Sequence, residues 1–243
     1  KLAAGLDALI LDVKTGSGAF MPTLEKSTAL AESLVSVANG AGTRTGALIT
    51  DMNEPLASAA GNALEVRNAV DFLTGKHRDP RLLEVTLALS AAALELTDFA
   101  GDARAACESA LYSGKALEHF SRMVSLLGGP TGFVENMDSH LAAAPIVRDV
   151  TIEGDGVIAA IDTRAVGMAV VTLGGGRRLP TEKIDFAVGF DRLAGLGTPV
   201  HGRTVIARIH ARTEDSDREA EERLRRAYEI GAQKPIFPLL AAQ

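Results

Sequence analysis

The residues best placed to do chemistry lie in one glycine-rich segment, Leu11–Met21. Gly16 and Gly18 would let the backbone bend tightly or approach a ligand closely, so their amides could cradle a phosphate group. The segment departs from the standard phosphate-binding motifs, because Met21 stands where a dinucleotide-binding loop has its last glycine and Lys14 precedes the glycines. A tight connection from a strand to a helix, without any ligand, is an equally good interpretation.

Two further groups of polar residues carry weaker signals. Asp12 and Lys14 alternate outward from the end of the expected strand, where parallel sheets place their sites, or they pair with neighbouring charges. Gly174–Gly176, followed by Arg177 and Arg178, resembles an anion-binding nest. A helix end that needs left-handed residues, with solvated arginines, explains that segment more simply.

The histidines and the single cysteine do not suggest a catalytic or metal centre. The histidines have no metal-ligand spacing, and none stands beside a serine or carboxylate pattern that suggests a triad, so surface or structural roles are expected for His77, His119, His140, His201 and His210. Cys107 lies in an alanine-rich helical pattern and cannot form an internal disulfide, so we expect a small core residue.

The composition is that of a folded globular protein. The chain has 243 residues, 47% of them hydrophobic and 23% charged, which suits one large or two medium domains. A net charge of −6 repels phosphate backbones, so no nucleic-acid partner is expected. No run approaches the roughly 18 apolar residues of a membrane span, so we expect no membrane partner and a cytoplasmic location.

The first half has the pattern of an α/β domain. The apolar run Ala8–Leu11 suits a buried strand of a parallel sheet, and Thr23 can cap the helix that follows. A strand at Thr45–Thr50 then completes a right-handed parallel crossover. The core face of the first helix is predicted from residues at helical spacing: Leu30, Leu34, Val37 and Ala41. Further helices are predicted over residues 58–73, 80–96, with Asp79 as N-cap, 102–112 and 115–127.

The character of the chain changes around Pro145, where short β-prone runs separated by glycine-rich turns begin. The predicted strands are 146–152, 157–161, 184–188 and 204–209, and the predicted helices are 163–173 and 215–230, with Pro235 and Pro238 ending regular structure. The sequence therefore predicts an α/β domain over residues 1–144 and a smaller α+β domain over residues 145–243.

One segment supports a hypothesis of a different class. The residue pattern is similar to that of the hairpins in biotinyl and lipoyl carrier domains over Gly195–Gly202 and the following Val205–His210. This similarity suggests a carrier or binding module. The carrier lysine with its usual neighbours is missing, since Lys183 lies in Thr-Glu-Lys-Ile.

Several motifs, in this order, resemble the pyrimidine nucleoside phosphorylase family. They are Leu11–Met21, Thr50–Asn53 with Pro55–Leu56, Gly61–Val66, and Gly174–Arg178 with Ile184–Gly189. Gly176–Arg178 and Asn39–Gly42 are more similar to the thymidine branch than to the broad-specificity pyrimidine branch. The resemblance implies that the chain is the distal part of the family's mixed, largely parallel-sheet α/β domain, followed by its α+β C-terminal domain.

The resemblance also implies a reaction: reversible phosphorolysis of thymidine to thymine and 2-deoxyribose 1-phosphate. The small-molecule partners would be thymidine or thymine and phosphate, and uridine as well if the protein has broad specificity. In the family, the phosphate loop and most residues that grip the base belong to segments preceding Lys1. The resemblance therefore assigns no catalytic residue here, implies an inactive isolated chain, and implies a homodimer for the full-length protein.

Four residues match binding positions of the family. Phe20 matches the apolar wall beside the pyrimidine. Leu56 and Ala59 match positions whose carbonyls bind potassium in the broad-specificity branch, together with a glutamate. Asn68 stands at that glutamate position, and its amide oxygen can coordinate a cation but carries no charge. A monovalent cation is thus an open expectation, and no other cofactor is expected.

Overall fold

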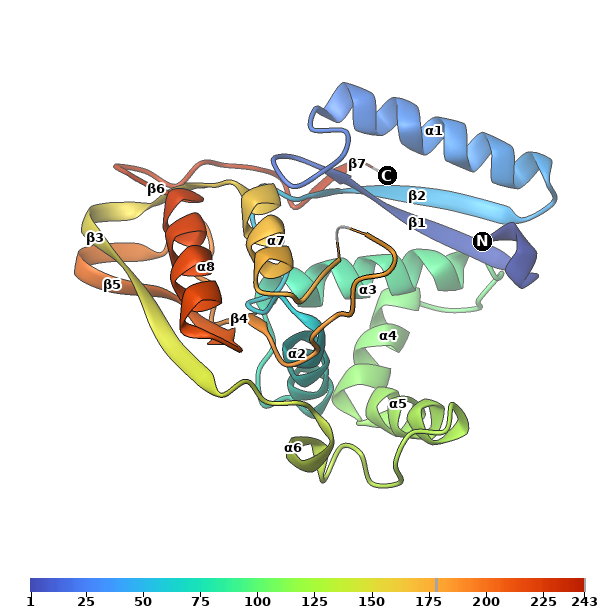
Figure 1. Cartoon of the computed structure of the whole chain (residues 1–243). Helices are drawn as coiled ribbons and strands as arrows, with labels where there is room; N and C mark the ends of the chain where they lie inside the picture. Colours follow the sequence, from blue (N-terminus) through green and yellow to red (C-terminus); the bar gives the residue numbers. More distant parts are fainter. Residues whose placement is uncertain (178, 243) are drawn as a thin grey trace.

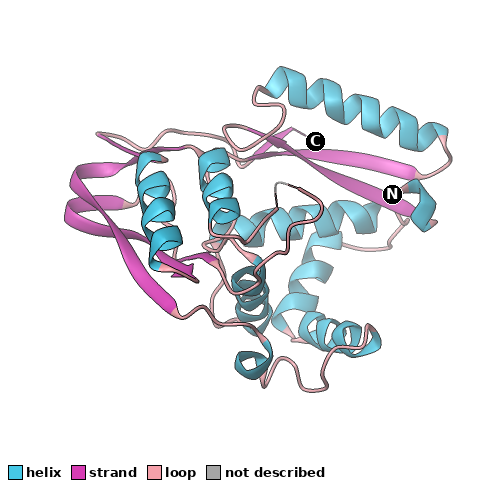
Figure 2. Cartoon of the chain, in the orientation of Figure 1, coloured by secondary structure: helices cyan, strands magenta, loops and turns pink. Residues whose placement is uncertain are grey.

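The computed structural model describes residues 1–177 and 179–242, and in this part of the chain the strands form two separate sheets (Figure 1). The first sheet has the strand order β1-β2-β7 and the second has the order β4-β5-β3-β6. Helices pack on both sheets, so the molecule is a mixed α/β protein, and the predicted fold class is confirmed (Figure 2).

The predicted parallel crossover opens the chain after a short 3-10 helix, Leu2–Ala4. Strand β1 (Ala8–Thr15) pairs in parallel with β2 (Arg44–Asp51), and α1 (Leu24–Gly40) connects them. Thr23 caps α1 as predicted, because its hydroxyl accepts a hydrogen bond from the Lys26 amide over 3.4 Å. Because β1 and β2 are parallel, the two strands end together, and the loops that follow them lie at one edge of the sheet.

The predicted core positions of this unit are partly wrong. The core between the strands and α1 consists of Val13, Ala31 and Ile49. In α1, Leu34 and Val37 are 42% and 64% exposed, because small residues such as Ala31 face the strands and let the helix lie close to them. The run Ala8–Leu11 is mostly half-buried, because β1 pairs only with β2 among the described strands.

A helical layer follows the second strand. It consists of α2 (Asn62–Thr74), α3 (Pro80–Glu95), α4 (Ala103–Tyr112), α5 (Lys115–Leu126) and the short α6 (Met137–His140). The first of these helices begins four residues later than predicted, because Ala60 is held in a β-bridge to Phe190. The two residues exchange hydrogen bonds of 2.9 and 2.7 Å. This bridge attaches the start of α2 to the second sheet.

The second sheet corrects three predictions. The two strands predicted over 146–161 are a single strand, β3 (Ile146–Ile161), which continues through Gly154 and Gly156 and pairs with β5 (Pro199–Ala211). The predicted strand 184–188 is irregular, and β4 (Gly189–Asp191) begins after it. The predicted helix 215–230 is α8 (Glu214–Arg226) followed by β6 (Tyr228–Gly231), because Tyr228 is buried in the core of this sheet.

The second sheet carries the larger apolar core. Helices α7 (Thr163–Thr172) and α8 pack side by side on it, as Figure 1 shows. Fully buried side chains such as Ile158, Phe190, Ile206 and Leu224 fill the space between the sheet and the helices. The second sheet and its two helices therefore form a close-packed, rigid unit against which the neighbouring loops can pack.

The end of the chain returns to the first sheet. Strand β7 (Leu240–Ala242) pairs antiparallel with β2, and the Asp51 amide donates to the Leu239 carbonyl over 3.0 Å. The sequence does not indicate this strand, because three residues after two prolines show no alternation of apolar and polar side chains. The division of the chain at residue 144 stays a prediction.

Candidate functional site at the strand ends

The glycine-rich loop after β1 donates its own amides to the protein. The amide of Gly16 donates to the Pro22 carbonyl over 3.2 Å, that of Gly18 to Met52 over 3.0 Å, and that of Ala19 to Gly16 over 3.0 Å. The amide of Ser17 donates to Asn53 Oδ1 over 3.1 Å. Because these four donors already have acceptors, the loop is a tight connection and not a phosphate cradle.

Gly16 is required by its surroundings. Its φ is +110°, and a Cβ atom built there would lie 2.8 Å from both the backbone and the side chain of Asn53. The glycine therefore lets the loop after β1 lie directly against the loop after β2. The two strand-end loops form one layer.

The ammonium group of Lys14 also has partners within the protein. Its Nζ lies 2.6 Å from Asp12 Oδ2 and 2.8 Å from Thr50 Oγ1, and the Thr50 hydroxyl donates to Asp12 Oδ1 over 2.6 Å. Of the two interpretations, pairing with a neighbouring charge is confirmed. The ammonium group balances a carboxylate on its own strand, so it is not a free anion ligand.

Phe20 stands at the tip of the loop with 93% of its surface exposed. An aromatic side chain that packs against nothing in the described residues contributes little to stability, and its exposure suits contact with a ligand. Its role as a wall of the base pocket stays a prediction.

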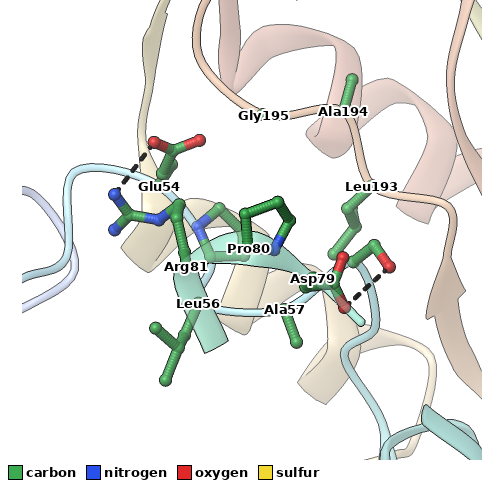
Figure 3. A pocket seen from close by; sticks show the side chains of 11 residues that line it. Glu54, Leu56, Ala57, Asp79, Pro80, Arg81, Leu193, Ala194 and Gly195 are labelled. Carbon is green, nitrogen blue, oxygen red and sulfur yellow. Dashed lines mark hydrogen bonds and ion pairs between the residues drawn. The ribbon is translucent and has the colours of Figure 1, made fainter. Parts of the chain in front are cut away.

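Beneath the loops lies a buried ionic group. Arg81 Nη2 lies 3.1 Å from Asp51 Oδ2, and Arg81 Nη1 lies 3.1 Å from Glu54 Oε1. Asn53 joins the group by donating its amide to Asp51 Oδ1 over 2.5 Å. In Figure 3 the side chain of Arg81 is directed toward Glu54, away from Asp79 at the other side of Pro80.

Tyr228, in the core of the second sheet, lies close enough to this ionic group to feel the charge of Glu54. The Tyr228 hydroxyl, which is buried there, donates to the Ala194 carbonyl over 3.0 Å. Burial, reinforced by the negative charge of Glu54, raises the pKa of Tyr228 well above its ordinary value. Tyr228 therefore stays neutral and serves as a hydrogen-bond donor at neutral pH.

Leu56, Ala59 and Asn68 lie around one cavity in the structure. All three line one largely apolar cavity of about 430 Å³ between the loop after β2, α2, α3 and α7. The Asn68 amide donates to Asp79 Oδ2 over 2.9 Å, so a carboxylate from another element stands beside the uncharged amide. The role of Leu56, Ala59 and Asn68 as cation ligands stays a prediction.

Asp79 is the centre of a small polar cluster. Burial alone would raise the pKa of Asp79, but hydrogen bonds from Asn68, Ser58 and His77 outweigh it and hold that pKa below its ordinary value. Asp79 was predicted as the N-cap of α3, and it occupies that position without a capping hydrogen bond from its side chain. Its carboxylate is used to hold the loop after β2 instead.

The same cluster brings a serine, a histidine and an aspartate together, which the sequence does not indicate. Ser58 Oγ lies 3.4 Å from His77 Nε2, and Asp79 Oδ1 lies 3.1 Å from the same nitrogen. A catalytic triad needs the serine and the carboxylate on different ring nitrogens, so this arrangement cannot relay a proton. The expectation of a structural role for His77 agrees with this geometry.

The glycine run after α7 is a helix end. The amide of Gly174 donates to Val171 and that of Gly175 to Val170, both over 3.0 Å, and Gly174 has a φ of +92°. These are the bonds of a helix C-terminus, so the simpler interpretation is confirmed. Arg178, the last residue of that motif, lies outside the described residues.

Two kinds of feature are absent from the described residues. Within residues 1–177 and 179–242, no three His, Cys, Asp or Glu side chains are grouped so that they could hold a metal ion. No described helix is both long enough and apolar enough to cross a membrane.

Comparison with known families agrees with this architecture. Residues 1–117 match the glycosyl transferase family a/b domain, which places the chain in the class of pentosyltransferases. Residues 157–231 match the pyrimidine nucleoside phosphorylase C-terminal domain. The chain therefore belongs to the pyrimidine nucleoside phosphorylase family. The C-terminal match includes the segment Gly195–Gly202, on which the carrier hypothesis was based, and assigns it to a phosphorylase domain.

Proposed function

We propose that the protein catalyses the reversible phosphorolysis of thymidine. A phosphate oxygen attacks the anomeric carbon, the bond to the pyrimidine nitrogen breaks, and its electron pair leaves on thymine. Membership of the family supports a reaction of the pyrimidine nucleoside phosphorylase class. The preference for thymidine is supported by the sequence of Asn39–Gly42 and of Gly176–Arg178, which are similar to the thymidine branch.

In this proposal the described residues contribute the base side of the pocket. The observation that carries it is the exposed Phe20 on a loop whose four preceding amides, those of residues 16–19, are used within the protein. Such a loop can present an aromatic ring to a ligand without binding an anion itself. Phe20 lies against the pyrimidine ring and helps to exclude water from the bond that breaks.

Phosphate binding falls to other groups. Lys14 is neutralised by Asp12, and the amides of residues 16–19 have acceptors within the protein. Residues 1–243 alone are therefore expected to show no turnover of thymidine in an ultraviolet assay. Turnover at a rate typical of nucleoside phosphorylases would contradict this part of the proposal.

The substrate preference is tested with the protein produced from its complete reading frame. Ultraviolet assays with thymidine and with uridine, at saturating phosphate, give kcat/KM for each. We expect a clear preference for thymidine. Equal values would favour a broad-specificity pyrimidine nucleoside phosphorylase instead.

The proposal includes a monovalent cation in the cavity lined by Leu56, Ala59 and Asn68. The two backbone carbonyls and the Asn68 amide oxygen would hold the ion, and Asp79 would supply the nearby negative charge. The ion would brace the loop after β2, on which the Phe20 loop rests through Met52 and Asn53.

A further inference from the structure

The loop that presents Phe20 is fixed from outside by few side chains. Phe20 itself packs against nothing in the described part of the chain, so the position of its ring depends on the loop backbone. At the far end, the Ser27 hydroxyl holds the Met21 carbonyl over 2.8 Å, but Ser27 is fully buried in α1. Near the start, Ser17 is the residue on which contacts from two different directions converge.

Ser17 is held from two sides. Its amide donates to Asn53 Oδ1 over 3.1 Å, which attaches it to the loop after β2. Its hydroxyl donates to the Ile161 carbonyl over 2.8 Å and accepts from the Thr163 amide over 3.3 Å. Ile161 ends β3 and Thr163 begins α7, so this serine links the Phe20 loop to the second sheet and its helix.

The adjoining glycine shows how close this contact is. A Cβ atom on Gly18 would lie 2.9 Å from both Met52 and Thr163. The loop is thus seated in a corner formed by the loop after β2 and the start of α7. The α7 side of this corner belongs to the core of the second sheet and its helices, in which Val166 is fully buried.

We propose that Ser17 is a positioning residue, which fixes the Phe20 loop to the β3–α7 corner through its hydroxyl. This inference rests on the proposed role of Phe20 in binding the pyrimidine. Ser17 touches no reacting atom in this scheme. Its hydroxyl restricts the directions that Phe20 can take before the nucleoside binds, which lowers the entropic cost of binding.

The chain offers a direct reporter, because it contains no tryptophan. In the Phe20→Trp variant of the 243-residue chain, the single indole reports the mobility of the loop. Adding Ser17→Ala is expected to lower its fluorescence anisotropy and to increase quenching by acrylamide. Ser17→Thr keeps the hydroxyl and is expected to restore both values, and Ser36→Ala, an exposed serine of α1, is expected to change neither. Unchanged anisotropy in the Ser17→Ala variant would overturn the proposal.

A measurement without substitutions covers the case in which Ser17→Ala fails to fold. Hydrogen exchange of the unmodified chain is expected to show protection of the amides of residues 16–19, which are donated within the protein. Exchange of these amides at the rate of an unstructured peptide would overturn the proposal.

Kinetics on the protein from its complete reading frame separate this inference from the proposed function. Ser17→Ala is expected to raise KM for thymidine about tenfold while KM for phosphate stays unchanged, and Ser17→Thr is expected to restore the value. If the unmodified enzyme does not phosphorolyse pyrimidine nucleosides at all, the proposed function fails. The anisotropy then still decides whether Ser17 holds the loop.

Discussion

The carboxylate of Glu54 accepts a hydrogen bond from the backbone amide of Leu196 over 2.7 Å. The two residues are 142 positions apart, and each lies in a segment that matches a different family domain. Glu54 is 5% exposed, and its other oxygen pairs with Arg81 over 3.1 Å. One buried side chain thus joins the strand-end loops of the first sheet to the second sheet.

We expect loss of this carboxylate to destabilise the fold. Glu54→Ala leaves the Leu196 amide without an acceptor and removes a partner of Arg81, so it is expected to lower the free energy of unfolding by about 2–4 kcal/mol. Glu54→Gln keeps an acceptor oxygen and is expected to cost about half as much. Urea unfolding measures both.

Glu32→Ala is the matched control, because Glu32 is exposed on α1. It is expected to change the free energy of unfolding by no more than about 0.5 kcal/mol. A Glu54→Ala variant as stable as this control would show that the link to Leu196 contributes nothing.

A second prediction concerns a buried carboxylate in α8. The side chain of Asp217 is fully buried, and its Oδ2 lies 2.9 Å from Arg148. Burial raises the pKa of Asp217 above its ordinary value, although the charge of Arg148 opposes this. Because the pKa is higher in the folded than in the unfolded chain, the charged carboxylate destabilises the fold at neutral pH, and this cost disappears as the pH falls through the folded pKa.

Asp217→Asn is therefore expected to raise the free energy of unfolding by about 1 kcal/mol at pH 7 and by much less near pH 4. Arg148 keeps Glu214 as a partner at 2.6 Å, so the substitution does not strand its charge. Urea unfolding at the two pH values provides the test, with the exposed Asp215→Asn as control. A variant that is less stable than the unmodified protein at pH 7 contradicts the prediction.

A third prediction addresses the cation. If K⁺ binds in the cavity beside Asn68, replacing potassium chloride by choline chloride at equal ionic strength lowers Tm by about 2–4 °C, for an ion present at several times its Kd. Asp79→Asn removes the neighbouring charge and is expected to abolish this difference.

Asp98→Asn is a suitable control, because Asp98 is exposed and asparagine tolerates its left-handed φ of 58°. This variant is expected to keep the full response to potassium. If the unmodified protein melts at the same temperature in both salts, the cavity holds no such ion.

The parts of the fold that sequence predicts well have strong local signals. Thr23 precedes a long helical pattern, and Pro80 follows an N-cap residue, so both helix starts could be located from neighbouring residues alone. The parts that were missed depend on distant partners. Ala60 pairs with Phe190, and Tyr228 packs in the core of the second sheet. In both cases the contacting residues are distant in the sequence.

The same distinction applies to the candidate site. The glycines and the aromatic of the loop after β1 could be recognised from their spacing, and so could the possibility that Asp12 and Lys14 pair with neighbouring charges. The contact of Ser17 with Ile161 spans 144 residues, and the cluster around Asp79 forms only when a loop and two helices meet. No local pattern carries those relationships.

The central claim is that Phe20 forms a wall of a pyrimidine pocket, and Phe20→Ala tests it most directly. Because the side chain is 93% exposed, Phe20→Ala is expected to leave Tm unchanged. The control Phe99→Ala is expected to change Tm by no more than a few degrees. In the protein from its complete reading frame, we expect KM for thymidine to rise about tenfold, with KM for phosphate unchanged. An unchanged KM for thymidine in a fully folded Phe20→Ala variant would contradict the account.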